Sequence, residues 1–326
     1  MARTDLEATK TMERTRLRME QVIARYDRAR GGGATVVPGL AAAYLTQPLM
    51  PTSHIFQPSL CVGIRGMKRI RLNDLVHTYD ADHFLLTTMG LPTIVEVPQA
   101  SSDDPYVAVV IDLDLDLARA TAAEIDISGR QAGKDDAAMI TAPISLSLAD
   151  AVSRLVGLLD EPADIPILSR LLQQEILYRL LTSPVGARLR QISRMGSQHE
   201  RVGRAATWLR QNLDRHIQMD DLAKMCGMGL STLNRHFLQM TGMSPLQYQK
   251  QMRLHEARRI LLTESVDAAT AAYRVGYESA TQFNREYKRL FGGPPIRDVK
   301  TIQEAAPVTG AGRGGALGPP FAVIGT

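Results

Sequence analysis

Polar and apolar residues alternate in different ways along this chain. Residues 5 to 30 form a charged, Arg-rich stretch with helical character, which ends at three consecutive glycines, Gly31 to Gly33. Between residues 42 and 111, short alternating or apolar runs are separated by Gly, Pro and Asp, which is typical of an antiparallel sandwich or barrel. Seven such runs predict strands: Ala42–Leu45, Leu60–Ile64, Met67–Leu72, Leu75–Tyr79, His83–Thr88, Ile94–Val97 and Tyr106–Ile111.

Helical spacing returns after the last of these runs. The acidic stretch from 112 to 135 is expected to include a short helix after Asp112. From Ser147 to about Leu181, leucines recur three and four positions apart, which predicts two helices. These helices carry more apolar surface than a linker needs, so we expect them to pack on the barrel or on a second subunit.

The stretch from Met219 to Arg297 contains the same small helical motif twice. Gly227 corresponds to Gly276 at an offset of 49 positions. Four later residues of the first motif correspond to four of the second at an offset of 50: Arg235, Phe237, Gly242 and Pro245 to Arg285, Tyr287, Gly292 and Pro295. One extra residue therefore lies within the second motif. A short helix, a glycine turn and an Arg-bearing second helix form a helix-turn-helix, and two in tandem would read two neighbouring segments of DNA groove.

Local signals place the helices of both motifs. Gly supplies the positive φ that a helix C-terminus requires, and Ser or Asp caps a helix N-terminus. We therefore expect a helix from Met219 to a turn at Cys226–Met228, a second helix from about Leu230 to Met240, and a connecting helix from Ser244-Pro245 to about Thr263. In the second motif we expect Asp267 to cap a helix over 268–274, Gly276 to make the turn, and Glu278-Ser279 to open a helix that ends near Gly292.

The outward side of each second helix carries residue types that read DNA. Arg pairs with guanine, Asn or Gln with adenine, and hydroxyl groups with either, while Lys or Arg one turn later is placed to meet a phosphate. The predicted DNA-binding residues are Ser231, Thr232, Asn234 and Arg235 in the first motif and Thr281, Gln282, Asn284, Arg285, Lys288 and Arg289 in the second. A single Arg on a helix surface is usually a solvated charge. The recurrence at matched positions of two turn motifs favours DNA contact.

The overall formal charge of +4 conceals two oppositely charged halves. Residues 199 to 300 contain sixteen Lys and Arg against ten Asp and Glu, whereas residues 31 to 140 contain seven against thirteen. The basic half is the electrostatic footprint expected for contact with phosphates, and the acidic half should stay off the DNA. A low-specificity architectural DNA-binding protein would share the basic half, and it stays open as an alternative.

Other chemistries find little support in the residues. No apolar run is long enough for a membrane span and no signal peptide begins the chain, so we expect a cytoplasmic protein. His54, His77 and His83 stand singly, without the His-x-His pair of a metal-binding cupin, and we expect no metal, no cofactor and no enzyme activity. Cys61 is expected to be a buried structural thiol, with a redox or aldehyde sensor as the alternative.

Two of the four histidines in the C-terminal half of the chain, His236 and His255, lie within the stretch from Met219 to Arg297. His236 and His255 have no partner at a spacing that would suggest a pair of metal ligands. We expect both to be polar residues at the surface or half-buried.

The segments GMGLSTLNRHFLQMTGMSPLQYQKQMRLHEARRILL and AAYRVGYESATQFNREYKRLFGGPP resemble the DNA-binding domain of the AraC/XylS family of transcription regulators, over about Gln198 to Asp298. By position, the resemblance makes Ser231, Asn234, Arg235, Thr281, Gln282 and Arg285 the base-contacting set. Gly229 departs from the family pattern, which usually has a helix-capping Ser there, although Gly is itself an acceptable N-cap.

The N-terminal half resembles the N-terminal domain of one AraC-type subfamily. The resemblance rests on VPGL at 37–40, PSLCVGIRGMK at 58–68 and SSDDPYVAVVIDLD at 101–114, and it departs at Arg65, where the subfamily usually has Gln. It implies a cupin-like jelly roll that senses a small-molecule effector, makes a homodimer contact, or both.

Together these observations predict an α+β chain with a cupin-like antiparallel β-barrel followed by an all-α tandem helix-turn-helix domain. The expected divisions are an N-terminal helix over 1–33, a cupin-like regulatory domain over 34–145, a helical segment with possible dimer contact over 146–197, the DNA-binding domain over 198–300 and a disordered tail over 301–326. The predicted function is a sequence-specific transcription regulator that binds double-stranded DNA and RNA polymerase. An activator is one expectation, and the residues leave activator and repressor both open. A cupin enzyme with an appended DNA-binding module is the remaining alternative.

Overall fold

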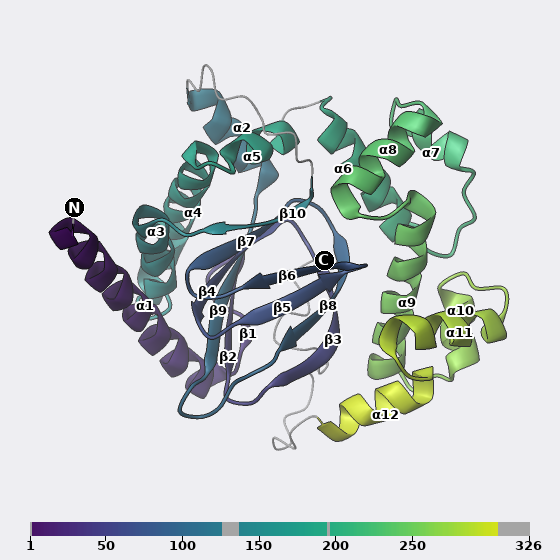
Figure 1. Ribbon diagram of the computed structural model, residues 1–326, viewed down its shortest axis with the longest axis horizontal. Coiled ribbons are helices and arrows are strands. Elements are labelled where there is room, and N and C mark those ends of the chain that lie inside the picture. Colours follow the sequence, from purple (N-terminus) through teal and green to yellow (C-terminus); the bar gives the residue numbers. More distant parts are fainter. Residues whose placement is uncertain (1, 126–136, 194–195, 306–326) are drawn as a thin grey trace. The chain divides into compact units, whose positions relative to one another are not determined.

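The computed structural model describes residues 2–125, 137–193 and 196–305 (Figure 1). The chain divides into two compact units. An N-terminal unit ends at Arg201, and a C-terminal unit begins at Val202, with the short stretch Gln239–Gly242 grouped with the first. The predicted α+β class is confirmed, because the first unit is built on antiparallel sheets and the second is helical.

The N-terminal unit contains two antiparallel sheets (Figure 1). The six-stranded sheet has the order β1-β2-β9-β4-β7-β10, and the four-stranded sheet has the order β3-β8-β5-β6. The strands are β1 Gly33–Ala34, β2 Leu40–Leu45, β3 Leu49–Phe56, β4 Ser59–Arg65, β5 Lys68–Leu72, β6 Leu75–Tyr79, β7 His83–Thr87, β8 Leu91–Val97, β9 Tyr106–Asp112 and β10 Met139–Pro143. The sheets meet where the buried Tyr79 and Tyr106 hydroxyl groups lie 3.2 Å apart.

Helices cover the other face of the six-stranded sheet. They are α1 Ala2–Arg30, α2 Leu115–Glu124, α3 Leu146–Gly157, a 3-10 turn at Pro162–Asp164, α4 Ile165–Thr182 and α5 Gly186–Ser193. One buried apolar cluster joins Met19 of α1, Val152 of α3 and Ile176 of α4 to Val62 and Val109 of the sheet. Strand β4 is therefore buried on both faces, which explains why it is a continuous apolar run without alternation.

All seven predicted strands are present, and the described residues contain three further strands that the sequence did not predict. Strand β3 is the clearest case, because it lies at the edge of the four-stranded sheet and contains Pro51. Its register shifts between Leu49 and Thr52, so the pattern of inward and outward residues is broken. Edge strands tolerate Pro and irregular pairing because one side forms no ladder, and such strands carry a weak sequence signal.

The C-terminal unit is all helical (Figure 1). Its helices are α6 Gln198–Gln211, α7 Met219–Met225, α8 Leu230–Thr241, α9 Pro245–Thr263, α10 Ala268–Arg274, α11 Ala280–Phe291 and α12 Pro295–Ala305. Helices α7 and α8 form the first predicted motif, α10 and α11 form the second, and α9 connects them. Helix α12 was not predicted, although Pro295 at its first position has the fixed φ that suits a helix start. The expected disordered tail over 301–326 was wrong for residues 301–305, which belong to α12, and its remainder lies outside the described residues.

The predicted caps of the C-terminal helices are confirmed. Ser244 and Gln247 form a reciprocal capping box at the start of α9. The Asp267 carboxylate accepts a hydrogen bond from the Thr270 backbone N–H at the start of α10. These bonds satisfy backbone donors that have no partner within a helix, and they fix where α9 and α10 begin.

Candidate nucleic-acid interface

The two helix-turn-helix motifs share the same backbone hydrogen bonds around their turns. Met228 N–H donates to the Ala223 carbonyl in the first turn, and Tyr277 N–H donates to the Ala272 carbonyl in the second, both at an offset of 49. Beyond the turn the offset becomes 50, with Leu233 N–H on Gly229 O matched by Phe283 N–H on Ser279 O. The extra residue predicted from the sequence therefore lies between the turn and the second helix, at Glu278.

Each second helix buries one side and exposes the other. Leu233 and Phe237 of α8 are fully buried, as are Phe283 and Tyr287 of α11. In α11, the Phe283 and Tyr287 rings meet edge to face at 5.4 Å between centroids. Because these apolar pairs are four residues apart, they hold one face of each helix inward and leave the polar face in solvent.

The predicted DNA-binding residues lie on that exposed side. Nine of the ten are exposed and Thr232 is half-buried. The exposed nine are Ser231, Asn234, Arg235, Thr281, Gln282, Asn284, Arg285, Lys288 and Arg289. Burial therefore withholds none of them from a duplex.

The structure divides the basic residues into two groups. Among the described residues, Arg285, Lys288 and Arg289 have no ion-pair or hydrogen-bond partner for their side-chain nitrogens. Arg258 and Arg274, by contrast, are paired with carboxylates. A cation that already has a protein partner gains less from a phosphate than an unpaired one. The cations of α11 are thus available to an anionic ligand.

Arg253 of α9 links the two motifs. Its guanidinium donates to the backbone carbonyl oxygens of Leu213 and Arg215, which lie between α6 and α7. It also donates to the carbonyl oxygen of Gly276 in the second turn, at 3.0 Å. One side chain therefore fixes the second turn to the loop that precedes the first motif. The sequence did not reveal this residue, because its partners lie 23 to 40 positions away.

A buried ion pair holds the second motif to α9 and α12. Arg258 is 3% exposed and makes two hydrogen bonds of 2.8 Å to the Asp298 carboxylate. Tyr287 of α11 donates to the same carboxylate at 2.7 Å, and the Arg258 guanidinium lies 4.5 Å from the centre of the Phe291 ring. The bidentate geometry and the additional donor satisfy charges that would otherwise be costly to bury.

Two histidines of the C-terminal unit are more buried than expected. His236 is 8% exposed and His255 is 3% exposed, so the expectation of surface or half-buried positions was wrong. Burial, with a further contribution from Arg258, lowers the pKa of His255 to about 3. Its ring packs edge to face on Phe291, 5.4 Å between centroids, and it serves the core of the second motif.

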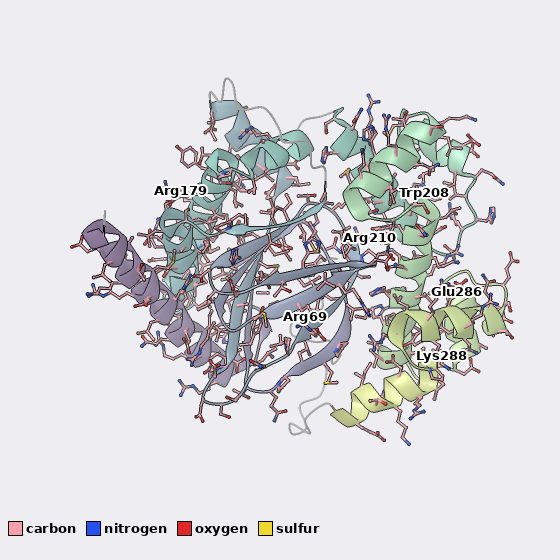
Figure 2. All side chains as sticks on the ribbon, viewed as in Figure 1. Arg69, Arg179, Trp208, Arg210, Glu286 and Lys288 are labelled. Atoms are coloured by element: carbon pink, nitrogen blue, oxygen red, sulfur yellow. The ribbon has the colours of Figure 1, made fainter. Side chains whose placement is uncertain are left out.

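Glu286 of α11 is a further residue that sequence reasoning missed. Figure 2 labels it near Lys288 on the same helix, yet Glu286 is 6% exposed while Lys288 is exposed. Its carboxylate accepts hydrogen bonds from Lys250 Nζ at 2.9 Å and from the Tyr277 hydroxyl group at 2.8 Å. The only sequence signal was a charged residue on the apolar side of the helix, next to Tyr287.

Cys61 and Lys68 are two titratable side chains buried inside the N-terminal unit. Cys61 is 0% exposed, which agrees with the expectation of a buried thiol, and burial raises its pKa to about 11. Lys68 is also fully buried, and burial lowers its pKa to about 8. The Cys61 thiol, with its raised pKa, is protonated at neutral pH and is a poor nucleophile. Within the described residues there is no group of three His, Cys, Asp or Glu side chains that could hold a metal ion.

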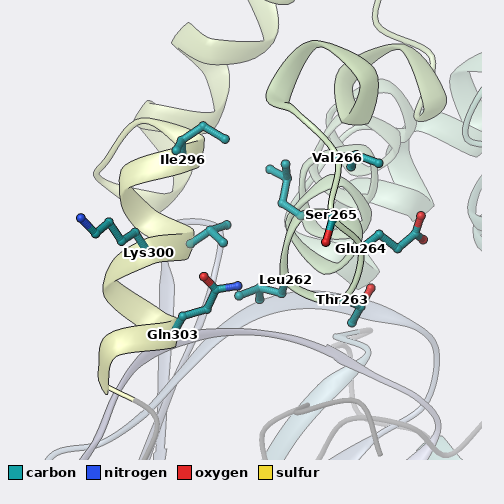
Figure 3. Close-up of a pocket in the computed structure, with 10 residues that line it drawn as sticks. Leu262, Thr263, Glu264, Ser265, Val266, Ile296, Lys300 and Gln303 are labelled. Atoms are coloured by element: carbon teal, nitrogen blue, oxygen red, sulfur yellow. The ribbon is translucent and has the colours of Figure 1, made fainter. Parts of the chain in front are cut away.

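An open pocket of about 280 Å³ lies on the second motif, between the end of α9, the segment that follows it, and α12 (Figure 3). It is lined by Leu261, Leu262, Thr263, Glu264, Ser265, Val266, Ile296, Val299, Lys300 and Gln303. None of the predicted DNA-binding residues belongs to this lining. In the described parts of the chain, no helix is both long and apolar enough to cross a membrane.

The geometry defines a class of protein: a DNA-binding chain with two linked helix-turn-helix motifs that follow a β-sheet domain. Comparison with known families agrees. The family described as AraC-type transcriptional regulator N-terminus matches residues 36–188, and the family described as helix-turn-helix domain matches residues 222–300. The chain belongs to the AraC family of transcription regulators.

Among curated relatives, the HTH-type transcriptional activator RhaS of Salmonella schwarzengrund is 26% identical over 165 residues, which is 50% of this chain and 58% of the relative. RhaS of Salmonella arizonae is 26% identical over 167 residues, with the same two coverages. The chain thus matches somewhat more than half the length of these relatives.

Solved structures show the same fold. ToxT of Vibrio cholerae O395, bound to (E)-4-(8-methylnaphthalen-1-yl)but-3-enoic acid, has a TM-score of 0.53 at 11% identity, covering 80% of this chain and 99% of that one. ToxT of Vibrio cholerae strain SCE256, described as bound to unsaturated fatty acid, has a TM-score of 0.50 at 11% identity, covering 82% and 97%.

Proposed function

We propose that this protein is a sequence-specific transcription regulator that places α8 and α11 in two adjacent major-groove segments of duplex DNA. The observation that carries the proposal is the pair of equivalent helices, each with an exposed polar face, joined through α9. Two such helices reach groove segments about one helical turn, roughly 34 Å, apart. Arg253 supports this interpretation, because it holds the turn of one motif to the loop beside the other.

The residues divide into two roles in this proposal. Ser231, Thr232, Asn234 and Arg235 of α8, and Thr281, Gln282, Asn284 and Arg285 of α11, contact base edges and so set the sequence. Lys288 and Arg289 contact phosphates and set the position of α11. The exposure of nine of these ten residues supports this division. The side-chain nitrogens of Lys288 and Arg289, which have no ion-pair or hydrogen-bond partner among the described residues, support their role at phosphates.

The N-terminal unit regulates DNA binding in this proposal by binding a small-molecule effector. The fatty-acid-bound structural relative supports it, because the fold of that protein accommodates a small ligand. We also propose that the protein forms a homodimer and acts as a cytoplasmic activator that contacts RNA polymerase, as the activator name of its curated relatives suggests. It carries out no enzymatic reaction in this scheme.

Arg285→Ala tests the base-reading assignment. We expect the binding free energy to fall by about 1–3 kcal/mol on the selected site, which is the duplex that the wild-type protein selects from random sequences. The preference at one base pair should relax, with little change on random duplex. Arg274→Ala is the matched control, because Arg274 lies on the same unit but is already paired with Glu264. Binding is measured by competition between the selected site and random duplex at fixed salt.

Equal losses of affinity on specific and random duplex would contradict base reading by Arg285. If the wild-type protein itself showed no preference over random duplex, the low-specificity architectural alternative would replace the proposal. The +6 net charge of residues 199 to 300 is the observation that keeps this alternative open.

A further inference from the structure

Glu286 lies inside the proposed reading helix and touches one of its reading residues. Its side chain is 7% exposed, and it occupies the turn of α11 that follows Gln282. Gln282 Nε2 donates to Glu286 Oε1 at 3.3 Å. A residue in the interior of the motif is therefore joined directly to a side chain that faces DNA in the proposed function.

Glu286 is itself held in place by two other elements. Lys250 of α9 donates to Oε1 at 2.9 Å, and Tyr277 of the turn donates to Oε2 at 2.8 Å. Burial raises the pKa of Glu286, but the hydrogen bonds from Lys250, Tyr277 and Gln282 outweigh burial and leave the pKa below its ordinary value. The carboxylate is ionised at neutral pH and can only accept hydrogen bonds.

This chemistry decides the orientation of the Gln282 amide. Oxygen and nitrogen of an amide look alike in shape, but only the nitrogen can donate to a carboxylate. One N–H of Gln282 is committed to Glu286. In the proposal developed below, Glu286 holds the N–H on the Cγ side of the amide. The other N–H and the oxygen then lie on the same side, and they form the donor and acceptor pair that matches N7 and the N6 amino group of adenine.

The first motif has no equivalent of the Gln282–Glu286 hydrogen bond. Its positions matched to Gln282 and Glu286 are Thr232 and His236 at the offset of 50. His236 is buried, and its Nε2 atom lies 3.4 Å from Arg235 instead. The arrangement is therefore a feature of the second motif and not of the repeat.

We propose that Glu286 is a positioning residue that orients the Gln282 amide and so gives the second motif a preference for adenine at one base pair. This inference rests on the proposed function, because it assumes that α11 reads the major groove. It adds which base Gln282 selects and which buried residue determines that choice.

The experiment selects duplexes from a library randomised over about two helical turns, roughly 21 base pairs, with full-length protein. For the wild type we expect at least about fivefold preference for adenine at one position, the lower end for a bidentate pair. Gln282→Ala should remove the preference there and identify the position. Glu286→Gln should reduce it to about twofold or less at that position alone.

Two further variants keep the test informative if Glu286→Gln folds poorly. Glu286→Asp keeps the charge but shortens the side chain, and it should also lose the adenine preference. Tyr277→Phe removes the bond to Oε2 and leaves the Oε1 bond to Gln282, so it should retain the preference. Thermal unfolding of each variant measures stability separately.

The outcomes separate the two proposals. Unchanged adenine preference in both Glu286 variants, with loss in Gln282→Ala, overturns the positioning role and leaves the proposed function standing. The positioning role is also overturned if the Glu286 variants weaken binding equally on all sequences. A wild-type protein that enriches no sequence overturns the proposed function itself.

Discussion

The free cations of α11 make a quantitative prediction about salt. Lys288 and Arg289 are exposed one turn beyond the base-reading residues, and their side-chain nitrogens have no ion-pair or hydrogen-bond partner among the described residues. If each meets a phosphate, each releases condensed counterions when the protein binds. The double variant Lys288→Gln/Arg289→Gln should then reduce the slope of log K against log salt by about 1.8, from 0.9 per contact.

The same slope gives the loss of affinity. If the lines for wild type and variant meet near 1 M salt, the variant binds about 200-fold more weakly at 50 mM salt and about 30-fold more weakly at 150 mM. The second figure corresponds to about 2 kcal/mol. The effect should be the same on specific and random duplex, because phosphate contacts carry no sequence information.

Fluorescence anisotropy of a labelled duplex, titrated at several salt concentrations, measures the slope. Arg259→Gln/Arg274→Gln is the matched control, because it removes the same charge from the same unit. Arg259 is already paired with Glu256 at 2.7 Å and Arg274 is paired with Glu264. We expect a clearly smaller change of slope in this control.

Two results would refute the reasoning. An unchanged slope in the Lys288 and Arg289 double variant would show that these cations do not reach phosphate. An equal decrease in both double variants would show that net charge alone governs binding, and that the division into free and paired cations has no consequence.

Two predictions concern stability, and both are measured by denaturant unfolding of the full chain. Gly227 and Gly276 both have positive φ, but a Cβ at Gly276 would lie 2.8 Å from the Asp214 Cα, whereas a Cβ at Gly227 meets nothing within 4 Å. Gly227→Ala should therefore cost about 1 kcal/mol and Gly276→Ala about 2–4 kcal/mol, and equal costs would contradict the close approach. The pKa of His255 is lowered to about 3, so the neutral ring contributes fully to the free energy of unfolding above about pH 6.5. That contribution is lost as pH falls toward 3, by about 1.4 kcal/mol per pH unit. His255→Leu should remove that pH dependence, which replacement of the exposed His216 should leave in place; an unaltered acid profile in His255→Leu would disprove the assignment.

Features that depend on near neighbours in the chain could be predicted from the sequence. The turn glycines, the caps at Ser244 and Asp267, and the apolar pairs of α8 and α11 all involve residues within four or five positions of one another. Helical periodicity and positive φ are local properties, so the tandem motif and its extra residue could be predicted without the fold. The outward side of each reading helix followed from the inward side.

Only the tertiary structure decided how the charged residues are used. From the sequence, Arg253 and Arg258 are equivalent cations of the connecting helix. In the fold, Arg253 joins two motifs and Arg258 is buried on Asp298, 40 positions away, while Arg285 stays free. Glu286 likewise meets Lys250, 36 positions earlier. Pairing of this kind depends on which helices pack together, which periodicity along one segment does not encode, and for the same reason the irregular edge strand β3 emerged only from its pairing with β8.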